Sequence, residues 1–298
     1  MLSFSKITLD DIAPLRNYFT YSTNKTCDNT VGGTFMWRDY FSVEYAEFNG
    51  TLMFKVRVKY HNDDTAFSIP LGKDVNGCII EIGRYCEAVG IPVRFCTVTR
   101  EELPLLTSLY GEVKVHQEKS WSDYIYRAED ITNLAGRRFS GQRNHINFLK
   151  KTFESFSFEE ISSKNLNEVR AFYDAFNLAV NKQSDIFAEE KEKTIEVLNN
   201  YDIYGLFGGL LRVNGSVAAF SIGELCRNVL FIHIEKADIN IRGAYQLINN
   251  EFARHFSTSE TEFINREEDV GDEGLRTSKL AYHPIEIIDK FIVEAGNR

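Results

Sequence analysis

The residues best suited to proton transfer lie in the segment FIHIEK, residues 231–236. Side chains of a β-strand alternate between its two faces, which places Phe231, His233 and Glu235 together on one face. A histidine beside a carboxylate can take up and release protons during catalysis, so Glu235 is a candidate general base, with His233 as its partner. A hydrogen-bonded structural pair at the edge of a sheet is the alternative interpretation.

A second candidate site begins where the next predicted strand ends. Residues 259–273 contain seven acidic side chains and one basic side chain. Open α/β sheets bind ligands beyond the carboxyl ends of their strands, which favours a substrate site at this position. A solvated charged loop is the alternative, and Arg276 and Lys279 follow closely enough to balance its charge.

A basic segment lies between the two halves of the chain. Residues 134–153 contain no acidic side chain, and their basic residues are Arg137, Arg138, Arg143, Lys150 and Lys151. Arg143, Asn147 and Lys150 fall on one face of a predicted helix, an arrangement suited to a phosphate-bearing ligand. An ordinary solvated helix face is the alternative.

The composition limits what kind of protein this is. The chain has 298 residues, 43% of them apolar, which suits about two domains with cores of their own. Its 43 acidic and 34 basic side chains give a net charge of −9, so any nucleic-acid partner must use a local basic face. The N-terminal residues carry no secretory signal, and no apolar stretch approaches the ~20 residues of a membrane span. The sequence therefore predicts a cytoplasmic protein with no integral membrane segment.

Cysteine usage and missing motifs set several chemistries aside. The five cysteines form no CxxC pair, which favours buried reduced thiols over a disulfide framework or a metal site. The sequence has no GxxxxGK[ST], HExxH, GxSxG or GxGxxG motif. Nucleotide hydrolysis, zinc proteolysis, α/β-hydrolase chemistry and Rossmann dinucleotide binding therefore lack their signatures.

Two similar sets of elements position these residues. The pairs Asn49-Gly50 and Asn214-Gly215 each lie between two runs rich in β-branched and aromatic residues, and Asn-Gly is typical of a type I′ hairpin. Each hairpin precedes a predicted strand, helix and strand: Ala66–Leu71, Val75–Val89 and Val93–Val98 in the first half, and Val229–Lys236, Gly243–Phe256 and Glu262–Asn265 in the second. We expect two copies of one α+β fold, each with a mixed and mostly antiparallel sheet, with domains at residues 1–118 and 119–298. Coincidence is the alternative, because hairpins are common.

Several segments resemble a bacterial family of uncharacterised proteins that share the C-terminal catalytic domain of phosphatidylglycerol lysyltransferases. They are NKTCDNTVGGTFMWRDYF (24–41), DYIYRAEDITNLAGRRFSGQRNHINFLKK (123–151), GSVAAFSIGEL (215–225), HIEKAD (233–238), GAYQLINNEFA (243–253) and FINREEDVGDEGLRTSKLAYHP (263–284). The resemblance covers most of the chain, and the run INREEDVGDEGLR is its most specific part.

This resemblance implies tandem GNAT (acetyltransferase-like) domains, as in the Fem peptidyltransferases, and aminoacyl transfer from a charged tRNA. GNAT enzymes that use acetyl-CoA carry a Q/R-x-x-G-x-G/A loop at a helix N-terminus, where backbone N–H groups hold the pyrophosphate. Aligning Gly243 with its central glycine puts Asn240 at the Gln/Arg position and Tyr245 at the last one. A tyrosine there crowds the close approach of a phosphate, which makes acetyl-CoA the less favoured donor.

We therefore expect an acyltransferase whose site lies in the C-terminal domain, where residues 229–236 and 262–265 meet the start of helix 243–256. The candidate catalytic residues are Glu235 and His233, and no metal is expected. The candidate substrate-binding residues are Asn265, Arg266, Asp269, Lys279, Tyr245 and Lys236. The candidate donor-binding residues are Arg143, Asn144 and Gly243.

The expected donor is aminoacyl-tRNA, and the acceptor is a small molecule, a peptide or a lipid with an amine or hydroxyl group. A CoA-dependent N-acyltransferase and a non-catalytic binding or regulatory module on the same fold are the two alternatives.

Overall fold

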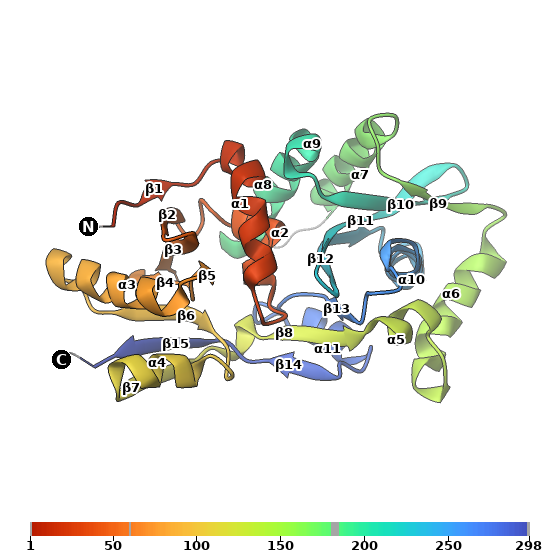
Figure 1. Cartoon of the computed structure of the whole chain (residues 1–298). Helices are drawn as coiled ribbons and strands as arrows, with labels where there is room; N and C mark the ends of the chain where they lie inside the picture. Colours follow the sequence, from red (N-terminus) through yellow and green to blue (C-terminus); the bar gives the residue numbers. More distant parts are fainter. Residues whose placement is uncertain (1, 60, 180–184, 297–298) are drawn as a thin grey trace. The chain divides into compact units, whose positions relative to one another are not determined.

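The computed structural model describes residues 2–59, 61–179 and 185–296, and the chain divides into two compact units. The first unit contains Met1–Asp123, Glu268–Glu273 and Ile287–Arg298, and the second contains Tyr124–Glu267 and Gly274–Glu286. Each unit is built around a β-sheet with helices against it (Figure 1). The expected α+β architecture with two mixed sheets is confirmed.

The sheet of the first unit has the strand order β1-β2-β3-β4-β6-β15-β7, with β5 also paired to β3. Its strands are β1 (Ser5–Lys6), β2 (Glu44–Phe48), β3 (Thr51–Val58), β4 (Asp64–Phe67), β5 (Leu71–Gly72), β6 (Arg94–Val98), β7 (Val113–Gln117) and β15 (Phe291–Ala295). Its α-helices are α1 (Ile12–Leu15), α2 (Val31–Met36), α3 (Val75–Val89) and α4 (Leu103–Tyr110). Short 3-10 helices are η1 (Leu9–Asp11), η2 (Arg16–Tyr21), η3 (Cys27–Asn29) and η4 (Lys119–Trp121).

Local sequence explains the main elements of this unit. Asn49 and Gly50 both have positive φ, 49° and 67°, and Phe48 pairs directly with Thr51, as a type I′ hairpin requires. Helix α3 begins where the Asp74 side chain accepts a hydrogen bond from the backbone N–H of Gly77, and it ends at the left-handed Gly90. Its apolar face packs on the sheet beside α4 in one core.

The sheet of the second unit has the strand order β14-β8-β13-β12-β11-β10-β9. Its strands are β8 (Asp123–Arg127), β9 (Phe156–Glu160), β10 (Phe207–Val213), β11 (Ser216–Cys226), β12 (Val229–Ala237), β13 (Phe263–Asn265) and β14 (Glu286–Ile288). Its helices are α5 (Ala128–Asn133), η5 (Arg137–Phe139), α6 (Ser140–Thr152), α7 (Leu166–Ala179), α8 (Asp185–Asn199), α9 (Tyr201–Tyr204), α10 (Ala244–Phe256) and α11 (Glu273–Leu280).

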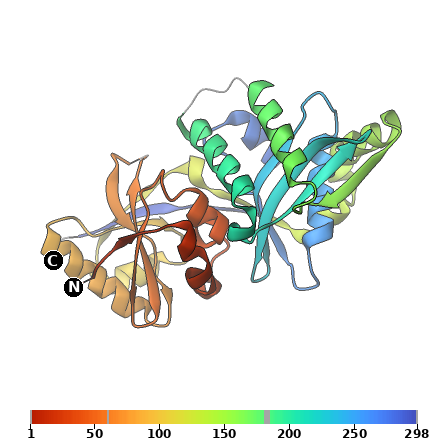
Figure 2. The same cartoon turned by 90° about the horizontal axis from the view of Figure 1, so that it is seen from above.

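Helices cover both faces of this second sheet. Helix α10 packs against one face, over β10, β11 and β12, and α7 packs against the other face over β11 (Figures 1 and 2). The second Asn-Gly hairpin forms as expected, since Asn214 and Gly215 have positive φ and Val213 pairs with Ser216. Buried α10 residues such as Leu247 and Phe252 pack with Leu230 and Ile232 of β12 in one core.

The two units differ from the expected consecutive segments 1–118 and 119–298. The chain first changes unit between Asp123 and Tyr124, and residues 268–273 and 287–298 return to the first unit. The reason is β15, which pairs with both β6 and β7 and so completes the first sheet with the C-terminal residues.

Within residues 2–59, 61–179 and 185–296, every helix is too short or too polar to cross a bilayer. The longest α-helices, α3 and α8, have 15 residues each, against about 20 for a transmembrane helix.

Candidate active site

Strand β12 of the second unit continues past the end of its parallel partner β13, and we call the region beside this overhang, around Glu235 and Arg266, the wedge. Their parallel pairing covers three residue pairs and ends at Phe231 and Asn265, while β12 continues to Ala237. The Glu235 side chain of β12 reaches across the wedge to Arg266, which follows β13, with Oε1 of the carboxylate 2.9 Å from Nη2 of the guanidinium. About one-tenth of each side chain is exposed to solvent.

The Glu235 carboxylate is fixed by two partners. Its Oε1 accepts a hydrogen bond from Arg266, and its Oε2 accepts one from the Asn249 side chain of α10, at 2.8 Å. A carboxylate offers about four acceptor positions, so one bond on each oxygen leaves capacity for a substrate proton. The arrangement orients Glu235 without saturating it.

Three buried polar atoms around this pair have no hydrogen-bond partner in the described part of the chain. They are Oγ of Ser221, Oδ1 of Asn249 and Nη1 of Arg266. Ser221 lies directly opposite Glu235 in the β11–β12 ladder, and Asn249 and Arg266 are the two residues bonded to Glu235. Buried polar groups are normally bonded to protein, water or ligand, so each of these three atoms is a position for a bound water or a substrate group.

Aromatic rings hold Arg266 in place. Its guanidinium carbon lies 4.7 Å from the centre of the Tyr282 ring and 6.0 Å from that of Tyr126. Burial opposes the charged form of Arg266, but the Glu235 carboxylate and the neighbouring tyrosines outweigh it and raise the pKa of the guanidinium. Lys279 donates a hydrogen bond from Nζ to the backbone carbonyl of Arg266, which ties α11 to the same site.

The prediction that His233 and Glu235 lie on one face of the strand is wrong, because β12 has a β-bulge at His233. Ile222 of β11 pairs with Ile234, whereas Gly223 pairs with Ile232, so His233 is the extra residue on β12. The bulge interrupts the alternation along the strand. Glu235 therefore bonds to α10, and His233 has different partners.

His233 lies between two carboxylates and is a cation. Its Nδ1 is 2.6 Å from Oε1 of Glu267, and its Nε2 is 2.9 Å from Oε1 of Glu224. Both nitrogens must donate to acceptor-only groups, which requires the doubly protonated ring. Burial alone lowers the pKa of His233, but the two hydrogen-bonded glutamates raise it to about 10. A ring that is already protonated at neutral pH cannot accept a proton, so Glu235 remains the base candidate.

This raised pKa predicts how stability depends on pH. The imidazole titrates near pH 6.5 in the unfolded chain and near pH 10 in the folded one, so its contribution is complete below about pH 6.5 and is lost as the pH rises towards 10. We expect the free energy of unfolding to fall by up to about 1.4 kcal/mol per pH unit across this window. Urea unfolding of the wild type should show this slope, and His233→Gln should lack it. The exposed pair of His255 and Glu160 provides the control, since His255→Gln should keep the slope. Equal slopes in the wild type and His233→Gln would contradict the ion-pair assignment.

The other expected substrate-binding residues fall into three places. Asn265 is fully buried at the end of β13, and its Oδ1 accepts a hydrogen bond from the backbone N–H of Glu267 at 2.6 Å, so it shapes the turn beside the wedge. Lys236 forms an ion pair of 2.5 Å with Glu190 of α8. Tyr245 packs at the edge of the core, and burial raises the pKa of its hydroxyl. Asp269 belongs to the first unit, where its Oδ1 accepts a hydrogen bond from the backbone N–H of Gly271.

Two of the three expected donor-binding residues, Arg143 and Gly243, have structural roles in the fold. Arg143 donates from Nη1 to the backbone carbonyls of Leu134 and Gly136, and so holds the turn after α5. Gly243 has φ of +97°, and a Cβ there would lie 2.3 Å from the carbonyl oxygen of His145. Gly243 is the N-cap of α10, and the close approach of α6 explains why this residue is a glycine. Asn144 is exposed on α6.

Sequence reasoning missed Asn249 and Ser221. Asn249 is one of two adjacent asparagines that are buried in the middle of the amphipathic helix α10. A buried amide in a helix interior needs a partner from another element, which is a signal that the sequence offers. Ser221 carries no such signal, because a serine inside a strand is common on either face.

Comparison with known proteins decides the family. The model of the family described as phosphatidylglycerol lysyltransferase, C-terminal, matches residues 19–294. The chain belongs to this family. Among curated proteins, an uncharacterized protein of Mycoplasmoides gallisepticum is 28% identical over 206 residues, which cover 66% of this chain and 63% of that relative. The chain thus spans less than two thirds of that relative.

Several solved structures share the fold of this chain. A conserved protein of unknown function from Bacteroides thetaiotaomicron is 29% identical with a TM-score of 0.90, over 99% of this chain and 100% of that one. The C-terminal domain of a putative lysylphosphatidylglycerol synthetase from Agrobacterium fabrum is 11% identical with a TM-score of 0.69, over 97% and 93%. FemX is 10% identical with a TM-score of 0.59, over 96% of each chain. The expected tandem GNAT-like, acyltransferase fold is confirmed.

Proposed function

We propose that this protein transfers an aminoacyl group from aminoacyl-tRNA to an amine or hydroxyl acceptor, with the wedge around Glu235 and Arg266 as its active site. The observation that carries the proposal is the family match over residues 19–294, since the family is described by a lysyltransferase activity. The geometry around Glu235 supports it, because acyl transfer to an amine needs a base at a partly desolvated site.

In this mechanism Glu235 accepts a proton from the acceptor ammonium or hydroxyl. The freed lone pair attacks the ester carbonyl that joins the amino acid to the tRNA. The new bond to the acceptor forms, the ester C–O bond breaks, and the 3′-terminal ribose oxygen leaves with the proton that Glu235 returns. An ammonium acceptor releases its second proton to solvent. Arg266 and Asn249 orient the carboxylate, and the buried Oγ of Ser221 is positioned to donate to a bound substrate or water.

A basic face on α6 and the start of α10 is the proposed contact for the tRNA. We define it by the exposed residues Arg137 of η5, Lys150 and Lys151 of α6 and Arg242, which precedes α10, together with the exposed ring of Phe148. The Arg242 guanidinium carbon lies 4.6 Å from the centre of the Phe148 ring, which is 41% exposed. Basic side chains beside an exposed ring suit a single-stranded end, whose phosphates need cations and whose bases stack.

A filter-binding titration tests the proposed donor. Charged tRNA should bind with log K falling linearly against log salt, with a slope of about −0.7 for each single-strand phosphate contact. The Lys151→Ala variant should weaken binding. Its slope should be shallower by about 0.7, the value for one lost phosphate contact. Lys73→Ala in the first unit removes the same charge from an exposed position and should leave the slope unchanged. Equal slopes for the two variants would overturn the assignment of this face.

Acetyl-CoA is the competing donor, and a melting experiment separates the two. The N-terminus of α10 packs against the α6 backbone at Gly243, which opposes a pyrophosphate at that helix end. We expect acetyl-CoA to leave the melting temperature unchanged, whereas a ligand at 100 times its Kd would stabilise by about 2.7 kcal/mol. A clear rise in melting temperature with acetyl-CoA, without tRNA binding, would favour a CoA-dependent N-acyltransferase. No response in either assay would favour a non-catalytic binding module.

A further inference from the structure

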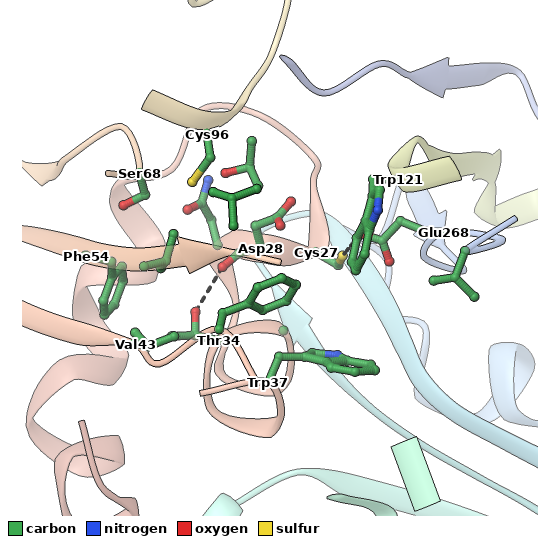
Figure 3. A pocket seen from close by; sticks show the side chains of 17 residues that line it. Cys27, Asp28, Thr34, Trp37, Val43, Phe54, Ser68, Cys96, Trp121 and Glu268 are labelled. Atoms are coloured by element: carbon green, nitrogen blue, oxygen red, sulfur yellow. Dashed lines mark hydrogen bonds between the residues drawn. The ribbon is translucent and has the colours of Figure 1, made fainter. Parts of the chain in front are cut away.

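The first unit contains a cavity that the proposed function does not use. Its volume is about 90 Å³, where one water needs about 10–15 Å³. Three of its walls are the rings of Trp37, Phe41 and Trp121, with Phe41 centred 6.4 Å from Trp37 and 5.6 Å from Trp121. Figure 3 shows Phe54 and Ser68 on one side of the pocket and Trp37 and Trp121 on the other.

The local sequence explains how these walls form. Alternation along β3 directs Met53 into the α3 core and Phe54 into the pocket on the opposite face. Trp37 and Phe41 follow α2, whose N-cap Thr30 accepts a hydrogen bond from the backbone N–H of Gly33. The Oγ of Ser68, which also lines the pocket, is buried without a hydrogen-bond partner in the described part of the chain.

Two carboxylates, Asp28 and Glu268, complete the lining, and an ion cluster lies behind them. The Lys290 ammonium, 2% exposed, is 2.7 Å from Oδ2 of Asp28 and 2.9 Å from Oδ1 of Asp123, and it also contacts Glu268. Cys27 donates its thiol to Glu268 over 3.2 Å. Burial and the neighbouring carboxylates raise the pKa of this thiol, which keeps it neutral.

The cluster holds more carboxyl groups than cations, and burial raises the pKa of Asp28 against the opposing effect of Lys290. Asp28, Asp123 and Glu268 supply three carboxylates, and Lys290 is the ammonium they share. Cys27, Asp28 and Glu268 are close enough together to hold a metal ion, and Lys290 contacts both carboxylates of that set. These carboxyl groups line the same pocket as aromatic rings, which attract organic cations through their π-faces.

We propose that this pocket binds a small organic cation, an ammonium group carried on a short apolar chain. Asp28 and Glu268 balance its charge, and the rings of Trp37, Phe41 and Trp121 enclose its apolar part and interact with the cation. This site lies within the first unit and goes beyond the proposed function, which requires only residues of the second unit.

Tryptophan fluorescence tests the proposal, because the protein has 2 tryptophans and both line the pocket. The probes are n-butylammonium, n-butanol and butyrate, which share their apolar chain and differ in charge. We expect a saturable change in emission with n-butylammonium at constant ionic strength, and none with butyrate or n-butanol over the same concentrations. An equal response to n-butanol, or no response to n-butylammonium, would overturn the proposal.

Matched variants locate the binding. The Glu268→Gln variant should weaken n-butylammonium binding about tenfold or more, since it removes one charged contact. Glu112→Gln removes a charge from an exposed position outside the pocket and should bind as the wild type does. If Glu268→Gln fails to fold, Trp37→Leu keeps every carboxylate, leaves Trp121 as the reporter and should weaken binding about 2- to 30-fold. Unchanged affinity in Trp37→Leu would contradict the proposed site.

Discussion

Replacing Glu235 by glutamine is expected to lower the rate of aminoacyl transfer by about 10²- to 10⁴-fold, the usual contribution of a general base. The amide can still accept a hydrogen bond from Arg266 or Asn249, so the fold should persist, but it cannot take a proton from the acceptor. The rate is measured as the transfer of a labelled amino acid from tRNA to the acceptor, at a saturating concentration of aminoacyl-tRNA.

The control for this variant is Glu262→Gln, which removes an exposed carboxylate beside β13 and should transfer at the wild-type rate. Melting curves of both variants establish that the fold is intact. A folded Glu235→Gln protein with full activity would remove Glu235 from the mechanism and leave its ion pair with Arg266 a purely structural one.

Replacing Lys290 by methionine is expected to destabilise the protein by about 3–5 kcal/mol, the usual cost of removing one partner from a buried ion cluster. Methionine keeps the length of the side chain, but the carboxylates of Asp28, Asp123 and Glu268 would lose the cation that they share. Burial alone lowers the pKa of Lys290, and these carboxylates raise it well above its usual value. The loss should therefore be undiminished from neutral pH up to about 10.5, where an unfolded lysine is also charged, and should shrink in acid as the carboxylates become protonated.

Urea unfolding at neutral pH measures this effect, with Lys73→Met as the control at an exposed position of the same unit. A change below about 1 kcal/mol, the range of surface ion pairs, would show that the cluster is solvated and would contradict its description as buried.

Local signals in the sequence were sufficient for much of the fold. The two Asn-Gly pairs predict both hairpins, because few other dipeptides adopt positive φ at two successive positions. Helix α3 matches the predicted range Val75–Val89. Capping was harder to predict: Asn240 is a good N-cap by type, but the N-cap of α10 is Gly243, where the α6 backbone leaves no room for a Cβ.

The relation of His233 to Glu235 could not be read from β12 alone. Alternation holds only in a regular ladder, and the bulge at His233 depends on how β12 pairs with β11. Gly223 lies at the register shift, where a Cβ would be 2.1 Å from the carbonyl oxygen of Phe231. A glycine inside a strand often marks such a bulge, so this signal was present in the neighbouring strand.

The ion cluster around Lys290 had no comparable signal. Cys27 lies 263 positions from Lys290 and 96 from Asp123, so only the folded chain brings them together. No periodicity or spacing in a single sequence reports a contact between such distant segments. Cys27 was expected to be a buried, reduced thiol, and that expectation is confirmed.

Transfer of label from tRNA is the measurement that tests the proposed function most directly. Total bacterial tRNA charged with a mixture of radiolabelled amino acids is incubated with the wild-type protein and, in separate reactions, with lipids, peptides or small amines. We expect label to leave the tRNA and appear on one acceptor class, at a rate that the Glu235→Gln variant does not reach. The proposed function would be contradicted if the label stayed on the tRNA in every reaction while acetyl groups were transferred from acetyl-CoA to the same acceptors.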